Sequence, residues 1–176
     1  MISLTELNGA TRETFVEHLG GLFEHSPWVA ERAWDRRPFA TREALHAAMV
    51  AAVEEAGTEQ QLALLRAHPE LAGRAAVRGE MTDHSTQEQG GSGLLNCSPE
   101  EFARLQELNR AYGEKFGFPF IVAVRGLDRA AIIEAFGRRL ENSREAEMAE
   151  ALRQIARITG LRIAGVVEET RGGQGD

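Results

Sequence analysis

Only one stretch of the chain has the pattern of a β-strand, and this feature limits the fold more than any other. Residues 118–124, Phe-Pro-Phe-Ile-Val-Ala-Val, form a run of seven residues without a charge. A strand needs a partner, and the sequence holds no second run of this kind. We therefore expect residues 118–124 to be a buried extended segment rather than part of a sheet. Alanine and leucine also dominate over the β-branched residues that sheets prefer, which favours helices.

Helix start signals recur along the rest of the chain. The clearest is Ser98-Pro99-Glu100-Glu101, which combines an N-cap, a proline at the first helical position and a capping-box glutamate. Thr11, Thr41 and Asp128 are further candidate N-caps, each followed by apolar residues at helical spacing. A helix is also predicted from Ser26-Pro27. The predicted helices cover about 11–25, 27–37, 41–56, 58–67, 98–117, 128–142 and 143–160, the last interrupted or ended near Gly160.

These patterns predict an all-α fold. A chain of 176 residues can bury a core without a metal or disulfide. We expect a single-domain helical bundle of about seven to nine helices with one buried extended segment. The domain is assigned to residues 1–169. Residues 170–176, Thr-Arg-Gly-Gly-Gln-Gly-Asp, have nothing to bury and are predicted to be a flexible tail.

Charge and cysteine content exclude several classes of protein. The formal net charge is −7 and no cluster of lysine and arginine forms a basic face, so we expect no nucleic-acid partner. The single cysteine, Cys97, rules out an intramolecular disulfide and fits a reducing compartment. No stretch approaches the roughly 18 apolar residues of a membrane span. The chain also lacks a leader pattern, so we predict a soluble, cytoplasmic protein without a membrane partner.

The helical pattern over residues 58–67 breaks at His68-Pro69. The residue before a proline is disfavoured in the α region, so His68 should lie just beyond the end of this helix. A histidine there titrates near neutrality and is a candidate catalytic group. The alternative is a structural histidine whose charge interacts with the helix dipole. Residues 73–97 then lack apolar periodicity, and a connection this long is usually functional or disordered.

Other candidates each have a structural alternative. Glu88 could act in catalysis, or it could complete a capping box with Ser85 at a short helical turn. Arg162 could pair with a ligand carboxylate, or it could be a surface arginine near the end of a helix. The backbone of residues 118–124 could bind a planar, amide-rich ligand, or it could bond to neighbouring loops.

Two further functions fit parts of the sequence. His84 and Glu88 lie four residues apart and could join His68 as metal ligands, as in a metal-dependent hydrolase of a cyclic amide. A second closely spaced ligand pair is missing from that pattern. A non-catalytic helical interaction domain would explain the capped helices and the acidic composition, but it gives the long connection and the break at His68-Pro69 no purpose.

Several motifs spread over nearly the whole chain belong together. They are Phe23-Glu24-His25-Ser26-Pro27-Trp28-Val29-Ala30, Arg37-Pro38-Phe39, His68-Pro69-Glu70-Leu71-Ala72, Ser85-Thr86-Gln87-Glu88-Gln89 with Gly93-Leu94, and Leu108-Asn109 through Tyr112 to Lys115-Phe116-Gly117-Phe118-Pro119-Phe120. In combination these motifs resemble the family of decarboxylases of 2-oxo-4-hydroxy-4-carboxy-5-ureidoimidazoline (OHCU), which act between urate and allantoin. The resemblance implies an all-helical fold, a homodimer, and neither a cofactor nor a metal.

The resemblance also implies roles for individual residues. It makes His68 the catalytic acid, Glu88 essential for catalysis, and Arg162 the functional arginine, with Arg139 and Arg125 as competing candidates. The product would be (S)-allantoin, formed by cofactor-independent decarboxylation in urate catabolism in a bacterial cytoplasm. The implied substrate-binding residues are Pro69, then Ser85, Thr86, Gln87, Glu88 and Gln89, and a wall made of Phe120, Ile121, Val122, Ala123, Val124 and Arg125.

Overall fold

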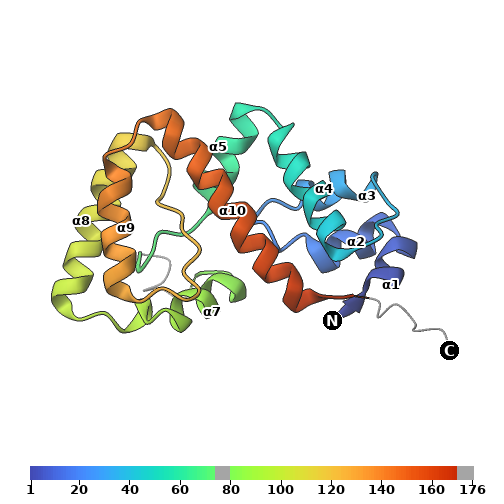
Figure 1. The fold of residues 1–176 in the computed structure, drawn as a ribbon, viewed down its shortest axis with the longest axis horizontal. Coiled ribbons are helices and arrows are strands. Elements are labelled where there is room, and N and C mark those ends of the chain that lie inside the picture. Colours follow the sequence, from blue (N-terminus) through green and yellow to red (C-terminus); the bar gives the residue numbers. More distant parts are fainter. Residues whose placement is uncertain (74–79, 170–176) are drawn as a thin grey trace. The chain divides into compact units, whose positions relative to one another are not determined.

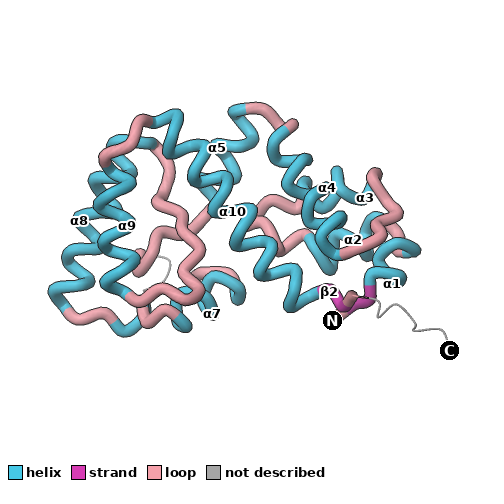
Figure 2. The backbone as a smooth tube through the Cα atoms, in the orientation of Figure 1, coloured by secondary structure: helices cyan, strands magenta, loops and turns pink. Residues whose placement is uncertain are grey.

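The computed structural model describes residues 1–73 and 80–169, and nearly all of its regular structure is helical (Figure 1). The predicted all-α fold class is therefore confirmed. Two short strands, β1 (Ile2–Ser3) and β2 (Val167–Glu168), pair in parallel with Ile2 opposite Val167 (Figure 2). In the part of the chain that the structure describes, no helix is long and apolar enough to cross a membrane. The predicted tail at residues 170–176 lies outside the described residues.

The chain forms two compact units. The first contains residues 1–64 together with the stretch that begins at Ala156, and the second is Leu65–Ile155. The divisions fall within α5 (Thr58–Ala67) and α10 (Arg144–Val166). A single domain over residues 1–169 stays a prediction.

The first unit is built around three helices. Helix α3 (Trp28–Trp34) packs against α2 (Arg12–Leu19) and α4 (Arg42–Glu54). The predicted caps of α2 and α4 are present, because the side chains of Thr11 and Thr41 accept backbone N–H groups three residues on. Phe15, Leu19, Leu45 and Met49 are buried from these helices.

The start of the first unit differs from the prediction. Helix α1 (Leu4–Gly9) was not predicted, although Ser3 and Glu6 form a complete capping box before it. Helix α2 ends at Leu19 instead of continuing towards His25. A side chain at Gly20 would meet the Val16 carbonyl at 2.6 Å, so the chain uses a glycine where it leaves the helix.

The beginning of α3 also differs from the prediction. Ser26 was expected to cap a helix that starts at Pro27, but α3 starts at Trp28 and has no side-chain cap. The Ser26 hydroxyl instead donates to the Glu24 carbonyl at 2.9 Å. The hydroxyl thus stabilises the turn before the helix instead of capping the helix. Serine side chains commonly bond to nearby backbone groups in this way.

The second unit contains the helices with the strongest start signals. The capping box of Ser98 and Glu101 opens α8 (Pro99–Phe116), and Asp128 caps α9 (Arg129–Leu140), as predicted. Helix α8 packs against α9, and the same unit contains α7 (Asp83–Gly91) and a 3₁₀ turn, η1 (Leu94–Asn96). The connection that lacks apolar periodicity is therefore partly helical.

Residues 118–124 form a buried extended segment, as predicted. The one strand pair of the described residues joins β1 to β2 and does not include this segment. Phe118 and Phe120 are 2% and 1% exposed, and the Phe120 ring stacks on Phe136 of α9 with 3.9 Å between centroids. Packing against aromatic side chains, rather than strand pairing, holds the segment in place.

Helix α10 corrects the prediction of a break near Gly160, because it continues without interruption to Val166. A Cβ at Gly160 would lie 3.2 Å from Cε1 of His46. The glycine allows a close approach between α10 and the His46 ring, whose Nε2 lies 3.0 Å from the Thr159 hydroxyl. A glycine can therefore mark a helix contact as well as a helix end.

Candidate functional site

His68 lies directly after the last residue of α5, as predicted. Its N–H donates to the Leu65 carbonyl at 3.2 Å, which closes the last turn of the helix. The residue is only 9% exposed. The turn that follows brings Leu71, Ala72 and Gly73 into the interior of the second unit.

Helix α7 carries the predicted binding segment and Glu88. Its N-cap is Thr82, whose hydroxyl accepts the N–H of Ser85 at 3.3 Å. The predicted capping box of Ser85 with Glu88 is therefore wrong, because the helix starts earlier than Ser85. Ser85, Glu88 and Gln89 share one face of the helix by spacing, with Ser85 and Gln89 each 3% exposed. Thr86 and Gln87 are exposed.

The side chain of Gln89 connects α7 to the turn after His68. Its Oε1 accepts the Ala72 N–H at 2.9 Å, and its Nε2 donates to the Glu70 carbonyl at 3.4 Å. The structure thus brings the predicted segment of residues 85–89 and the turn after His68 together. The contact is made by a side chain that we expected to bind substrate.

Helix α8 supplies two more amide side chains to the same turn. Asn109 Nδ2 donates to the Leu71 carbonyl and Gln106 Nε2 donates to the Ala72 carbonyl, each at 2.9 Å. We call Gln89, Gln106 and Asn109 the amide clamp. In the sequence, Asn109 belongs to one of the matching motifs but was given no role, and Gln106 was not identified as a candidate. The available signal was a pair of amides three residues apart, one of them among the apolar residues of α8.

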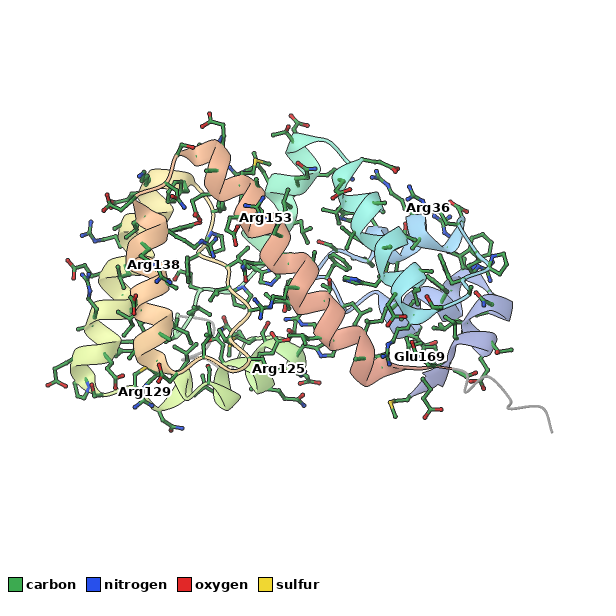
Figure 3. The ribbon with its side chains drawn as sticks, in the orientation of Figure 1. Arg36, Arg125, Arg129, Arg138, Arg153 and Glu169 are labelled. Atoms are coloured by element: carbon green, nitrogen blue, oxygen red, sulfur yellow. The ribbon has the colours of Figure 1, made fainter. Side chains whose placement is uncertain are left out.

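Several backbone groups of the wall at residues 120–125 make hydrogen bonds within the protein. The Ile121 carbonyl accepts from Arg139 Nη1 at 2.5 Å, the Ala123 N–H donates to Gln154 Oε1 at 3.0 Å, and the Val124 carbonyl accepts the Leu127 N–H at 3.0 Å. These three backbone groups therefore bond within the protein, as in the alternative to ligand binding that was considered for residues 118–124. Arg125, at the end of the wall, is exposed (Figure 3).

Arg139 has a structural role beside the wall. Its guanidinium pairs with Glu147 at 2.9 Å and lies over the Phe120 ring, 4.5 Å from the centroid. Glu147 is fully buried and also accepts hydrogen bonds from Tyr112 and Asn142. Burial and the neighbouring Glu147 carboxylate raise the pKa of Tyr112 well above its usual value.

Arg162 lies on α10 in the first unit and is buried. Its Nη1 donates to the Leu22 carbonyl at 3.0 Å, and its Nη2 donates to Glu24 Oε1 at 3.1 Å. The side chains of Arg162 and Glu24 are 2% and 1% exposed. The alternative of a surface arginine is therefore wrong. His68, the segment of residues 85–89 and the wall belong to the second unit.

The metal-ligand set of the alternative hydrolase reading does not form among the described residues. Across residues 1–73 and 80–169, no three histidine, cysteine, aspartate or glutamate side chains are close enough together to hold a metal ion. His68, His84 and Glu88 are all among these residues. A surface hollow of about 310 Å³ in the first unit also contains none of the predicted site residues; Arg12, Glu13, Val16 and Glu31 line it.

Comparison with known proteins gives a consistent result. A family model described as OHCU decarboxylase matches residues 8–164. The 2-oxo-4-hydroxy-4-carboxy-5-ureidoimidazoline decarboxylase of Haloferax volcanii is 43% identical over 93% of this chain and 95% of its own length. The protein of the same name from Halalkalicoccus jeotgali is 41% identical over 92% of this chain and 90% of its own length. The uric acid degradation bifunctional protein PucL of Bacillus subtilis is 38% identical over 96% of this chain, which spans 33% of that protein.

Two solved structures resemble the chain. One described as (S)-allantoin synthase has a TM-score of 0.76 at 29% identity and covers 94% of this chain. This chain spans 54% of that chain, about half of its length. The other, described as OHCU decarboxylase in the presence of (S)-allantoin, has a TM-score of 0.65 at 21% identity and covers 89% of this chain and 97% of that one. The second likeness establishes a shared fold.

Proposed function

Because the chain belongs to the OHCU decarboxylase family, whose model matches residues 8–164, we propose that it converts 2-oxo-4-hydroxy-4-carboxy-5-ureidoimidazoline to (S)-allantoin during urate breakdown. The observation that carries this proposal is the similarity, over more than nine tenths of the chain, to decarboxylases named for this substrate. The similarity to a uric acid degradation protein supports the same pathway.

The proposed reaction is a decarboxylation followed by protonation of the same carbon. The bond between the ring carbon and the carboxylate breaks, carbon dioxide leaves, and the electron pair passes into the conjugated ring of the substrate. Because the substrate itself accepts the electron pair, the reaction needs no separate electron sink. The protein has to orient the carboxylate, stabilise the negative charge and deliver a proton to one face of the ring.

His68 is the catalytic acid in this proposal. Its imidazole gives the proton to the carbon that carried the carboxylate and recovers a proton from solvent after product release. Pro69 fixes the direction in which the chain leaves the histidine, because the proline ring restricts φ. Burial of His68 supports the role, since it limits the access of water that would protonate either face of the intermediate.

Glu88 orients the imidazole of His68 and is essential for activity in this proposal. The structure supports a role beyond capping, because Thr82 rather than Ser85 caps α7. Ser85 shares the helix face of Glu88 and contributes to substrate binding with the other residues of the 85–89 segment.

The wall at residues 120–125 and Arg162 complete the proposed binding groups. A ring with ureido and carbonyl groups is planar and rich in hydrogen-bonding atoms, which suits recognition by backbone N–H and C=O groups. The Ile121 carbonyl, the Ala123 N–H and the Val124 carbonyl are already bonded within the protein, so we assign the substrate contacts to other groups of the wall. Arg162 is the functional arginine in this proposal, as the family resemblance implies, and the buried Glu24 fixes its guanidinium in place.

We further propose that the protein is a homodimer in a bacterial cytoplasm. The family resemblance supports the dimer, and the single free thiol of Cys97 is compatible with a reducing compartment. Light scattering of the purified protein would give twice the 19.3 kDa of one chain. A mass of 19.3 kDa across the concentrations used for the activity assay would contradict the dimer.

The function is tested by generating OHCU in place from urate and following the circular dichroism of allantoin. Spontaneous decay gives racemic product without a dichroic signal. We expect the protein to accelerate product formation and to give a signal of one sign that grows with enzyme concentration. Racemic allantoin formed at the spontaneous rate, in the presence of folded protein, would overturn the proposed function.

A further inference from the structure

Four backbone groups of the turn after His68 are bonded by side-chain amides. Within three consecutive residues, the Glu70 carbonyl, the Leu71 carbonyl, and both the N–H and the carbonyl of Ala72 each meet an amide of the clamp. Most protein hydrogen bonds to backbone groups come from other backbone groups. In this turn the Gly73 N–H also donates to the Glu70 carbonyl at 3.3 Å, but the other bonds to these four groups come from side chains of α7 and α8.

The conformation of the turn requires such support. Ala72 has a φ of +49°, in the left-handed region that residues other than glycine rarely adopt. The clamp bonds both backbone groups of this residue, through Gln89 and Gln106. A sparsely populated backbone conformation persists where the surroundings over-determine it, and such residues cluster at functional sites.

Asn109 is an unusual residue for its position. It is 5% exposed on the face of α8 that also buries Leu105, Leu108 and Tyr112. Its Nδ2 bonds to Leu71, while within residues 1–73 and 80–169 its buried Oδ1 meets no hydrogen-bond donor. An apolar side chain would avoid this unmet acceptor. Among the described residues, the side-chain amide of Asn109 bonds to Leu71, in the turn that follows the histidine.

We propose that Gln106 and Asn109 are positioning residues for His68. By holding the carbonyls of Leu71 and Ala72, they fix the path of the chain after Pro69, and Gln89 ties the same turn to the helix that carries Glu88. The clamp therefore sets the imidazole of His68 against Glu88. This inference rests on the proposed function, in which His68 delivers the proton.

The proposal predicts a specific kinetic defect. Asn109→Leu keeps the size of the side chain and removes the donor to Leu71, and Gln106→Leu removes the donor to Ala72. We expect kcat for OHCU to fall about 10- to 100-fold for each variant, while KM changes less than about 2-fold, because a small misplacement of a catalytic group reduces the rate of the chemical step. We also expect a weaker dichroic signal per mole of allantoin, since a misplaced acid lets water protonate the other face.

Asn8 offers a matched control. Its amide also holds a loop, because it donates to the Phe39 carbonyl at 2.9 Å and accepts the Phe39 N–H at 2.8 Å. Asn8→Leu removes the same kind of bond in the first unit, so it should alter stability without altering the handedness of the product. Thermal unfolding shows which variants are folded at the assay temperature. If Asn109→Leu does not fold, the half-buried Gln106 provides the test through Gln106→Leu.

The outcomes separate the clamp from the proposed function. Wild-type kcat and full dichroic yield in folded Gln106→Leu would overturn the positioning role and leave the decarboxylase function in place. The same losses in Asn8→Leu would also overturn it, because the effect would then follow from general destabilisation. Inactivity of the wild-type protein towards OHCU would overturn the proposed function itself.

Discussion

Glu24 and Arg162 form an ion pair that is almost completely shielded from solvent. Glu24 Oε1 lies 3.1 Å from Arg162 Nη2, and the two side chains are 1% and 2% exposed. The same guanidinium donates to the Leu22 carbonyl, so helix α10 fixes the irregular segment between α2 and α3. The motif that begins at Phe23 thus gains a structural meaning, because its glutamate is the partner of the proposed functional arginine.

Removing the charge of Glu24 is expected to destabilise the protein strongly. Glu24→Gln leaves the Arg162 cation buried without its counter-charge, and we expect the free energy of unfolding to fall by about 3 kcal/mol. Urea denaturation measures the change. The control is Glu31→Gln, which breaks the exposed pair of Glu31 with Arg12 and should cost less than about 1 kcal/mol. Equal effects of the two substitutions would show that burial does not set the strength of the Glu24 pair.

Loss of the His68 imidazole is expected to abolish stereospecific catalysis. His68→Asn cannot donate the proton, so kcat/KM should fall by about 10²- to 10⁴-fold. The dichroic assay with OHCU generated from urate measures this change. His18→Asn is the control, because His18 is exposed on α2. One-handed allantoin produced at the normal rate by His68→Asn would remove the histidine from the mechanism.

Arg139 and Arg138 give a neighbouring pair of substitutions with opposite expectations. Arg139→Met strands the fully buried Glu147 carboxylate and releases the Ile121 carbonyl, so we expect a loss of about 3–5 kcal/mol in unfolding free energy. Arg138 pairs with Glu134 at a surface where both side chains are 70% exposed, and Arg138→Gln should cost less than about 0.5 kcal/mol. Chemical denaturation compares them. An Arg139→Met protein as stable as Arg138→Gln would contradict the structural role of Arg139.

The buried Tyr112 predicts a loss of stability at high pH. Its folded pKa is raised above its unfolded value by burial and by Glu147, so the folded state favours the protonated phenol. The stabilising effect is complete below pH 10, the unfolded value, and decreases above it by about 1.4 kcal/mol per pH unit. Tyr112→Phe should remove this part of the slope.

The chain contains a single tyrosine, which gives a direct optical measurement. Tyrosinate absorbance should stay flat above pH 10 while the protein is folded and rise together with unfolding. A titration of Tyr112 near pH 10 in folded protein would contradict the raised pKa. The difference in stability between wild type and Tyr112→Phe isolates Tyr112 from Cys97, whose thiol pKa is also raised by burial.

Chelation distinguishes the decarboxylase from the metal-dependent hydrolase. His68, His84 and Glu88 do not form a metal-ligand group, so treatment with a chelator followed by its removal should leave the rate of allantoin formation unchanged. Activity that disappears with the chelator and returns with a divalent metal would favour the hydrolase.

Local signals predicted the fold more completely than the site. Ser98, Asp128 and Thr41 open helices where their cap chemistry indicates, because the N-cap is decided by residues three apart. The extended segment was also predictable, since its run of uncharged residues lies between two strong helix signals. The continuation of α10 through Gly160 was not, because the reason for this glycine is the His46 ring, more than a hundred residues away.

The same limit applies to the site. The position of His68 follows from the proline after it, which is a local effect. The amide clamp joins residues 17 to 38 positions apart, and no periodicity in the sequence pairs Asn109 with Leu71. The capping pattern at Ser85 was misleading because Thr82, three residues earlier, offers an equivalent hydroxyl and is the residue that the helix uses.

The pairing of β1 with β2 has a consequence for the order in which the protein can be made. The second unit is one uninterrupted stretch, Leu65–Ile155, and can fold once that stretch has left the ribosome. The first unit includes residues from both ends of the described chain, with Ile2 opposite Val167. Residues 1–64 can therefore complete their unit only after the stretch that begins at Ala156 has been synthesised, whereas Leu65–Ile155 can fold before that stretch is available.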